Sequence, residues 1–357
     1  MTVFRSTKVR TLLLSAFTYV LYLNIRYLAS STRVSTDVDV FATRLVGLYA
    51  GMYATHGFET CRQKVDSCLL RQKSTKGIIC IEHPVTDHAP DRLSKTHPPT
   101  NFAWNRSCGV DYCGLVFIGA EFAESSRFLS VDTTEYCKIL FHVEPQELFP
   151  VSQAITQYAH SVDIVLTSID PEKLPVSVIG KTFPFLYGSS WLGRGDMGLH
   201  PKQKLISIIA SSKRQLTGHK LRHALIERYG HRMDLFGSGY SHIDDKILAL
   251  RDYRYSVIIE NSIDKFWFTE KLIDAFVTGT VPLYWGGTAV LDLFDERGLL
   301  TFTDLDDFES ILNLCSEQDY NSRLGAIKKN IIIAENYLNP EGLIEQFILQ
   351  PLNLIPS

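Results

Sequence analysis

Polar residues between two apolar segments give the first indication of chemistry in this chain. Glu260, Asn261 and Ser262 follow one apolar run, and Thr269 and Lys271 lie where a helical pattern begins. A lysine beside the positive N-terminal end of a helix gains nothing from the helix dipole, so we expect a negatively charged ligand to favour that placement. Because the amides of a first helical turn also point outward, the pattern predicts an anion site that suits a diphosphate.

The elements that must hold these residues can be predicted from the flanking sequence. The β-branched run at 256–259 is typical of a buried parallel strand, and side chains at the end of such a strand commonly face a ligand. Thr269 is a suitable N-cap, and Gly279 ends the helix that follows. A second strand is predicted at 281–285. This order of strand, helix and strand is one unit of a doubly wound α/β domain.

In order, spacing and residue type, three segments resemble the donor-binding region of glycosyltransferase family 10, the α-1,3-fucosyltransferases. They are ENS at 260–262, TEK at 269–271 and GTVPLYWG at 279–286. The similarity extends with decreasing strength from about Lys202 to Asn336. It implies an α/β protein of the GT-B type, in which two Rossmann-like domains face one another.

The resemblance also implies an activity. It predicts an inverting enzyme that transfers L-fucose from GDP-fucose to a hydroxyl of a glycan acceptor, which is a glycoprotein, a glycolipid or an oligosaccharide. No cofactor is expected, and a divalent metal is expected to be at most stimulatory. Two alternatives stay open: the same fold with another nucleotide-sugar donor, and a non-catalytic glycan-binding descendant of such an enzyme.

Two glutamates are the catalytic candidates. By the resemblance, Glu270 stabilises the positive charge that develops on the fucose ring, and Glu144 is the general base for the acceptor hydroxyl. Glu147 is the rival base. Without the resemblance, Glu144 would cap the turn at Pro145, and Glu270 would complement the dipole of its own helix.

The other candidates are assigned to the donor. Lys271 matches a family position that binds the phosphates by charge, and Asn261 matches one that makes a directed hydrogen bond. Glu260 is expected on the ribose hydroxyls, as at other nucleotide-binding strand ends. Trp267 stands where the family often has a tyrosine, so it offers stacking but no phenolic hydroxyl. Thr269, the first residue of TEK, completes the donor-binding set.

A further cation for the diphosphate is expected from a helix predicted at 218–229. Counting back from the segment MDLFG puts Lys220 at the family's arginine, whereas a shift of two residues puts Arg222 there. Arg222 is preferred because a guanidinium can bind phosphate through two parallel hydrogen bonds. A solvated surface is expected for the neighbouring basic residues Lys213, Arg214, His219 and His223.

Composition describes an ordinary globular protein of 357 residues, with a formal net charge of -3 and 45% hydrophobic residues. The absence of a basic excess argues against a nucleic-acid partner. Apolar runs at 77–83, 114–120, 137–145 and 162–168 predict the strands of a first α/β domain. The expected division is 1–35 for a cytoplasmic tail, signal anchor and short stem, 36–195 for an acceptor-side domain, 196–340 for a nucleotide-sugar domain and 341–357 for a C-terminal tail.

The N-terminus has the features of a membrane signal. Arg5, Lys8 and Arg10 precede an apolar segment at 11–23, which approaches the roughly 20 residues of a spanning helix when it is continued to Ala29. This pattern predicts a single-pass type II protein of the Golgi membrane with a lumenal catalytic region. The alternatives are a cleaved signal, and a helix that does not span, which would leave the protein soluble or peripheral.

Seven cysteines fit no zinc-binding pattern. In a lumenal protein, Cys61 could pair with Cys68, or Cys108 with Cys113. Cys80 and Cys137 lie in apolar runs, which favours buried free thiols. The acidic segments at 37–39 and 304–307 lack the context of a metal site, so no metal ligand is predicted.

Overall fold

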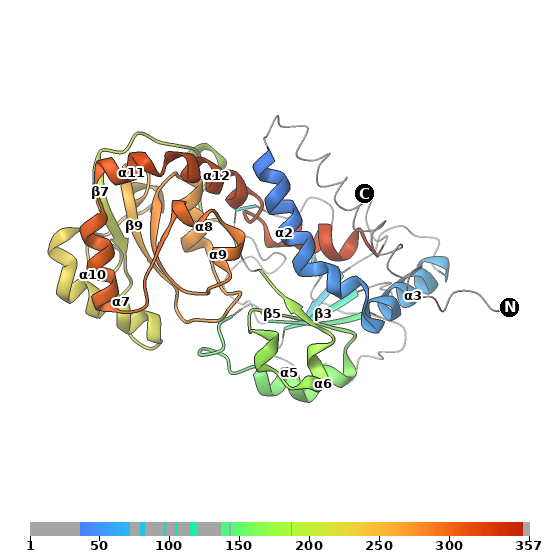
Figure 1. Ribbon diagram of the computed structural model, residues 1–357. Helices are drawn as coiled ribbons and strands as arrows, with labels where there is room; N and C mark the ends of the chain where they lie inside the picture. Colours follow the sequence, from blue (N-terminus) through green and yellow to red (C-terminus); the bar gives the residue numbers. More distant parts are fainter. Residues whose placement is uncertain are drawn as a thin grey trace.

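Two parallel β-sheets with helices on their faces form the architecture of the protein (Figure 1). We refer to them as the N-terminal and the C-terminal sheet. The expected α/β class with parallel sheets is therefore confirmed. The computed structural model describes residues 36–71, 79–82, 96–97, 104–105, 115–119, 137–142, 144–186 and 188–352.

The N-terminal sheet has the strand order β2-β1-β3-β4-β5-β6, and all its described pairs are parallel. Its strands are β1 (Ile79–Glu82), β2 (Trp104–Asn105), β3 (Leu115–Gly119), β4 (Cys137–Phe141), β5 (Ile164–Thr167) and β6 (Thr182–Pro184). Alternate residues of β4 face opposite sides, as a pleated strand requires. Ile139 packs with helices α2 (Thr36–Tyr53) and α3 (His56–Arg71), and Leu140 packs with α5 (Ser152–Tyr158) and α6 (Val176–Ile179).

The C-terminal sheet has the order β11-β10-β9-β7-β8, again with parallel pairs. Its strands are β7 (Lys204–Ile209), β8 (Asp234–Phe236), β9 (Tyr253–Ile259), β10 (Val281–Trp285) and β11 (Leu300–Thr301). Every residue of β10 is buried, which explains its continuous apolar sequence. The covering helices are α7 (Thr217–Tyr229), α8 (Glu270–Val277), α9 (Val290–Leu293), α10 (Leu305–Leu314), α11 (Glu317–Ser322) and α12 (Leu324–Glu335).

Helix α8 is the element that the sequence patterns predicted most closely. Thr269 is its N-cap, and the side chain accepts a hydrogen bond from the amide of Lys271. Gly279 follows the helix with a φ of 69°, a left-handed conformation that glycine adopts without strain. The helix therefore starts and stops where the local residue types dictate.

The C-terminal residues return to the N-terminal sheet. The segment predicted as a tail contains most of α13 (Pro340–Ile344) and a π-helical turn, Glu345–Leu349. The ring of Phe347 stacks on Tyr49 of α2 with 4.5 Å between centroids, and the hydroxyl of Tyr53 donates to the carbonyl of Phe347 over 3.0 Å. Helix α2 also contacts α9 and α12, so it packs against elements of both halves. Shorter helical turns are Ala159–Ser161, Pro171–Lys173, Arg194–Asp196, Gly230–Arg232, Lys246–Ala249 and Glu296–Gly298.

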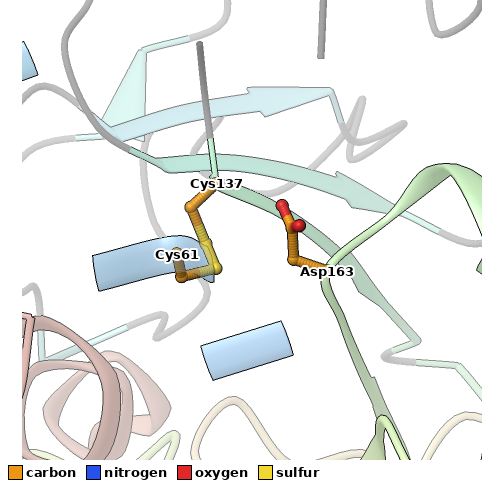
Figure 2. Close-up of side chains that lie close together, drawn as sticks. All are labelled: Cys61, Cys137 and Asp163. Carbon is orange, nitrogen blue, oxygen red and sulfur yellow. A yellow bond between two sulfur atoms is a disulfide. The ribbon is translucent and has the colours of Figure 1, made fainter. Parts of the chain in front are cut away.

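A disulfide joins α3 to β4 and corrects the predicted state of two cysteines. Cys61 pairs with Cys137, which had been expected to be a free thiol (Figure 2). The pairing of Cys61 with Cys68 is therefore wrong. The packing of α3 on β4 brings together two residues separated by 76 positions in sequence, a proximity that local spacing does not reveal. Cys315 is a buried free thiol.

The predicted membrane anchor lies within residues 1–35, outside the described part of the chain. Within the ranges that the structure describes, no helix combines the length and the apolar character needed to cross a membrane.

Candidate functional site

Loops after the carboxyl ends of strands from both sheets contact one another. The amide of Phe266, in the loop after β9, donates to the carbonyl of Ser168 after β5 over 3.0 Å. The amide of Gln146, after β4, donates to Asp264 Oδ2 over 2.9 Å. Lys265 forms an ion pair of 3.2 Å with Asp170. The ENS to TEK segment is therefore fixed against the other half of the molecule.

Glu260 directly follows β9 and is fully buried. Its Oε1 accepts the amide of Thr269 at 2.9 Å, and its Oε2 accepts the Thr269 hydroxyl at 2.8 Å and Lys271 Nζ at 3.3 Å. Both oxygens therefore serve the start of α8. In this arrangement Glu260 positions the helix end and the ammonium group of Lys271. Its expected contact with ribose hydroxyls stays a prediction.

Glu270 lies between two ammonium groups. Its Oε1 is 3.5 Å from Lys271 Nζ and 3.4 Å from Lys246 Nζ, and 14% of its side chain is exposed. Burial raises the pKa of this carboxyl, but Lys271, Lys246 and Thr269 outweigh burial and lower it to about 2. Glu270 is therefore a fixed negative charge at neutral pH, which suits stabilisation of a cationic sugar and not proton transfer.

Lys271 remains a cation although it is largely enclosed. Burial lowers the pKa of its ammonium group. The negative charges of Glu270 and Glu260 raise this pKa by more than burial lowers it, so the net shift is upward. A quarter of its side chain is exposed. The ammonium group therefore stays charged and reachable at the N-terminal end of α8.

The structure separates the two cations between which the sequence left a choice. Arg222 is 6% exposed, and its Nη2 donates to the carbonyl of Ile259 over 2.5 Å. Burial lowers the pKa of its guanidinium, and the charges of Glu260 and Glu270 oppose that shift, which places Arg222 among the charged residues at the start of α8. Lys220 is exposed. We call Arg222, Glu260, Glu270 and Lys271 the charged cluster.

Helix α7 is seated directly on the ENS segment. The amide of Gly218 donates to the carbonyl of Asn261 over 3.0 Å. A Cβ atom at Gly218 would lie 1.8 Å from the carbonyl oxygen of Glu260, so no other residue fits this contact without a backbone shift. The side chain of Asn261 hydrogen-bonds to His219. His219 and His223 are 5% and 9% exposed, so the solvated surface predicted for them is wrong.

Glu144, the predicted base, follows β4 and stands close to the charged cluster. Burial raises the pKa of its carboxyl, Lys271 and Lys213 lower it, and Glu270 raises it, with a net upward shift. A raised pKa suits a general base that works near neutral pH. Lys213 is exposed, and its charge reaches Glu144 although the two residues lie far apart in sequence.

Glu147, the rival base, has a structural contact. Its Oε1 accepts hydrogen bonds of 2.8 Å from both the amide and the hydroxyl of Thr217, the first residue of α7. It therefore holds the two halves of the molecule together at that helix end. Trp267 is 2% exposed, so its ring lies in the interior and presents no face on which a donor could stack.

Four residues near Glu270 were missed: Asp274 lies on the same helix, whereas Lys246, Ser190 and Trp191 come from distant parts of the chain. Lys246 contacts both Glu270 and Asp274, and Asp274 accepts hydrogen bonds from Ser190 and from the amide of Trp191. Asp274 lies on α8, one helical turn after Glu270. The buried carboxylate one turn after Glu270 was the available signal.

Charged side chains at the carboxyl ends of parallel strands, beside a helix N-terminus, define a nucleotide-binding class of α/β protein. Residues 199–323 match the model of one such family, described as Glycosyltransferase family 10 (fucosyltransferase) C-term. This match confirms the predicted resemblance for this part of the chain. The charged cluster lies entirely within the matched residues.

Known relatives match parts of the chain. The α-(1,3)-fucosyltransferase FucT of Helicobacter pylori is 29% identical over 107 residues, which are 30% of this chain and 21% of that protein's length. A crystal structure of an α1,3-fucosyltransferase is 16% identical, with a TM-score of 0.43, and covers 77% of this chain and 94% of its own. A structure of an α1,3-fucosyltransferase with GDP-fucose is 14% identical, also with a TM-score of 0.43, and covers 77% and 95%.

Proposed function

We propose that the protein is an inverting glycosyltransferase of the GT-B type that transfers L-fucose from GDP-fucose to a hydroxyl of a glycan acceptor. The observation that carries the proposal is the ionised Glu270 beside Lys271 at the start of α8. Both residues lie inside the region that matches the fucosyltransferase family. The names of the relatives support fucose as the sugar and GDP-fucose as the donor.

In the proposed donor complex, Lys271 and Arg222 bind the diphosphate together with outward amides of the first turn of α8. Arg222 contributes a planar guanidinium, and Lys271 contributes a compact charge. Asn261 makes a directed hydrogen bond to the donor. Thr269 and Glu260 hold the helix end and Lys271 in place through the hydrogen bonds described above.

In the proposed reaction, Glu144 takes the proton of the acceptor hydroxyl. The acceptor oxygen forms a bond to the anomeric carbon of fucose while the bond from that carbon to the phosphate oxygen breaks. GDP leaves with the electron pair, and the anomeric configuration inverts. The carboxylate of Glu270 stabilises the positive charge on the sugar ring, and the cations stabilise the departing diphosphate.

The remaining parts of the proposal concern the rest of the chain. Residues 36–195 supply the acceptor side and residues 196–340 the donor side. A signal anchor within residues 1–35 would place the catalytic region in the Golgi lumen, and this stays a prediction about residues outside the described part of the chain.

A panel of nucleotide sugars tests the donor. Thermal shift and release of free sugar are measured with GDP-fucose, GDP-mannose, UDP-GlcNAc and UDP-galactose. We expect selective stabilisation by GDP and GDP-fucose, with slow release of fucose. A preference for a uridine sugar would keep the fold and overturn the named activity. If glycans stabilise the protein, while no donor stabilises it and no donor is hydrolysed, the non-catalytic alternative would be favoured.

The isosteric variant Glu270→Gln is the matched control for this panel. It removes the negative charge and keeps the size of the side chain. Because the diphosphate is assigned to Lys271 and Arg222, the variant should still be stabilised by GDP while fucose release falls about 10³-fold. Loss of both responses would place Glu270 in binding and not in sugar activation.

A further inference from the structure

Lys246 lies in a helical turn before β9 and reaches two carboxylates of α8. Its Nζ is 3.4 Å from Glu270 Oε1 and 3.2 Å from Asp274 Oδ2. It also stands over the ring of Trp191, 4.1 Å from the centroid. One ammonium group thus bridges Glu270 to the residue one helical turn further along, beneath an aromatic cover.

Asp274 is held in place by hydrogen bonds that do not involve Lys246. Its side chain is 1% exposed, and Oδ1 accepts the Ser190 hydroxyl at 2.7 Å and the amide of Trp191 at 3.0 Å. The second oxygen, Oδ2, therefore points to Lys246. A buried carboxylate with such partners leaves little freedom for the ammonium group that it holds.

The two lysines beside Glu270 have different second partners. Lys271 also contacts Glu260 and the Thr269 hydroxyl, and the proposed function draws it toward a diphosphate. Lys246 has Asp274 as its second partner, deep in the same helix. When a diphosphate binds Lys271, Glu270 can lose its contact with Lys271 but keep its contact with Lys246.

We propose that Lys246 is a positioning residue: held by Asp274 and covered by Trp191, it keeps the carboxylate of Glu270 pointing at the fucose ring. Its kinetic consequence rests on the proposed function, whereas the coupling between Lys246 and Glu270 does not. The other charged groups that act on Glu270 or its neighbours are Lys271, Glu260, Arg222, Glu144 and Asp274.

The kinetic test compares Lys246→Met and Lys246→Arg with the wild-type protein in fucose release from GDP-fucose. Methionine should lower kcat about tenfold or more and change the donor KM less than twofold, because a misplaced group costs rate and not donor binding. Arginine keeps the charge and should recover most of kcat. Lys204→Met is the matched control and should leave kcat unchanged. Lys204 lies at the exposed amino end of β7 and pairs with Asp234 of β8.

Non-additivity separates positioning from a merely structural role. In a Glu270→Gln background, Lys246→Met should change kcat less than twofold, because the group that it positions is gone. An equal loss of kcat in both backgrounds would overturn the proposal. So would a Lys246→Met variant with normal kcat.

A stability cycle tests the contact without any turnover. Unfolding constants in urea at pH 7 are measured for the wild type, Lys246→Met, Glu270→Gln and the double variant. The factor by which Lys246→Met changes the unfolding constant should be about fivefold smaller in the Glu270→Gln background. Purely additive effects on the free energy of unfolding would refute the coupling. If the wild-type protein releases no fucose, the proposed function fails, and this cycle alone decides the inference.

Discussion

The carboxyl ends of the two sheets differ in the charged side chains that lie there. At the C-terminal sheet, enclosed acids and bases form ion pairs: Glu260, Glu270 and Asp274 with Lys271 and Lys246. The charge of Arg222 also acts on Glu260 and Glu270. At the N-terminal sheet, Glu144 lies near His142, whose pKa is lowered by burial to about 3. His142 is therefore neutral, and its Nδ1 is 3.1 Å from the Thr167 hydroxyl.

At the N-terminal sheet, an ion pair and a disulfide lie at the other end of the strands. Asp163, just before β5, binds Lys64 Nζ at 2.9 Å and the amide of Lys138 at 2.9 Å. The disulfide between Cys61 and Cys137 lies beside this carboxylate (Figure 2). Although two sulfurs and a carboxylate can resemble metal ligands, here the sulfurs bond to each other and the carboxylate binds an ammonium and an amide.

This difference matches the two steps proposed for the reaction, donor binding at the C-terminal sheet and proton transfer at the N-terminal sheet. Fixed charges at the C-terminal sheet suit the binding of an anionic donor and the stabilisation of a cationic sugar, because groups already oriented need no rearrangement during reaction. Burial keeps the pKa of Glu144 raised, which suits proton transfer. The disulfide and the ion pair of the N-terminal sheet lie away from that residue.

The largest expected effect is on the charged side. Glu270→Gln should lower the rate of fucose transfer about 10³-fold, in line with the removal of a single group that stabilises transition-state charge. Unfolding in urea should show that the fold persists. The measurement is kcat at saturating donor. A variant with more than a tenth of wild-type kcat would mean that the paired charges serve structure and not the reaction.

The next effect is on the less charged side. Glu144→Gln should lower kcat about 10²-fold while the dissociation constant of GDP-fucose changes little. Because a base must be deprotonated and burial raises this pKa above 4.5, wild-type kcat/KM should rise with pH through that raised value. The variant should lose this rise. Weakened donor binding with normal kcat would remove Glu144 from the role of base.

The disulfide tests whether stability and chemistry are separated in the N-terminal half. A variant with alanine at both Cys61 and Cys137 should lose about 3 kcal/mol of unfolding free energy, since the crosslink closes a long loop. Donor affinity should stay the same, because the link lies at the opposite end of β4 from Glu144. The readouts are urea unfolding and GDP titration on one preparation. A large loss of GDP affinity in the folded variant would contradict the separation.

Local sequence was sufficient for the C-terminal half. The cap at Thr269, the glycine after α8 and the continuous apolar strand at 281–285 each act on neighbouring residues, so residue types alone predict them. The resemblance then supplied roles for Glu270 and Lys271. What local patterns could not supply was Lys246 and Trp191, because only the packing of the turn before β9 and the connector between the sheets brings them to α8.

The N-terminal half shows the same limit more strongly. Its strands were predicted from apolar runs, and β4 and β5 lie where those runs predicted them. The pairing of Cys61 with Cys137 was not, since spacing favoured a partner seven residues away over one 76 residues away. The burial of His219 and His223 was missed for a related reason. Both lie on a helix face that looks polar in sequence and is covered only when α7 packs on the ENS segment.

The smallest expected effect separates the two candidate cations of α7. Lys220 is exposed and Arg222 is buried beside Glu260 and Glu270, although two positions separate them. Lys220→Met should therefore change the dissociation constant of GDP less than twofold, since removing a solvated charge costs little. Arg222→Met, as the matched variant, should weaken GDP binding about tenfold or more, because a buried guanidinium with charged partners is replaced by an uncharged side chain. Isothermal titration of GDP against both variants gives the answer at one ionic strength. The reverse order would move the diphosphate to the exposed face of α7 and leave Arg222 as a structural support for the end of β9.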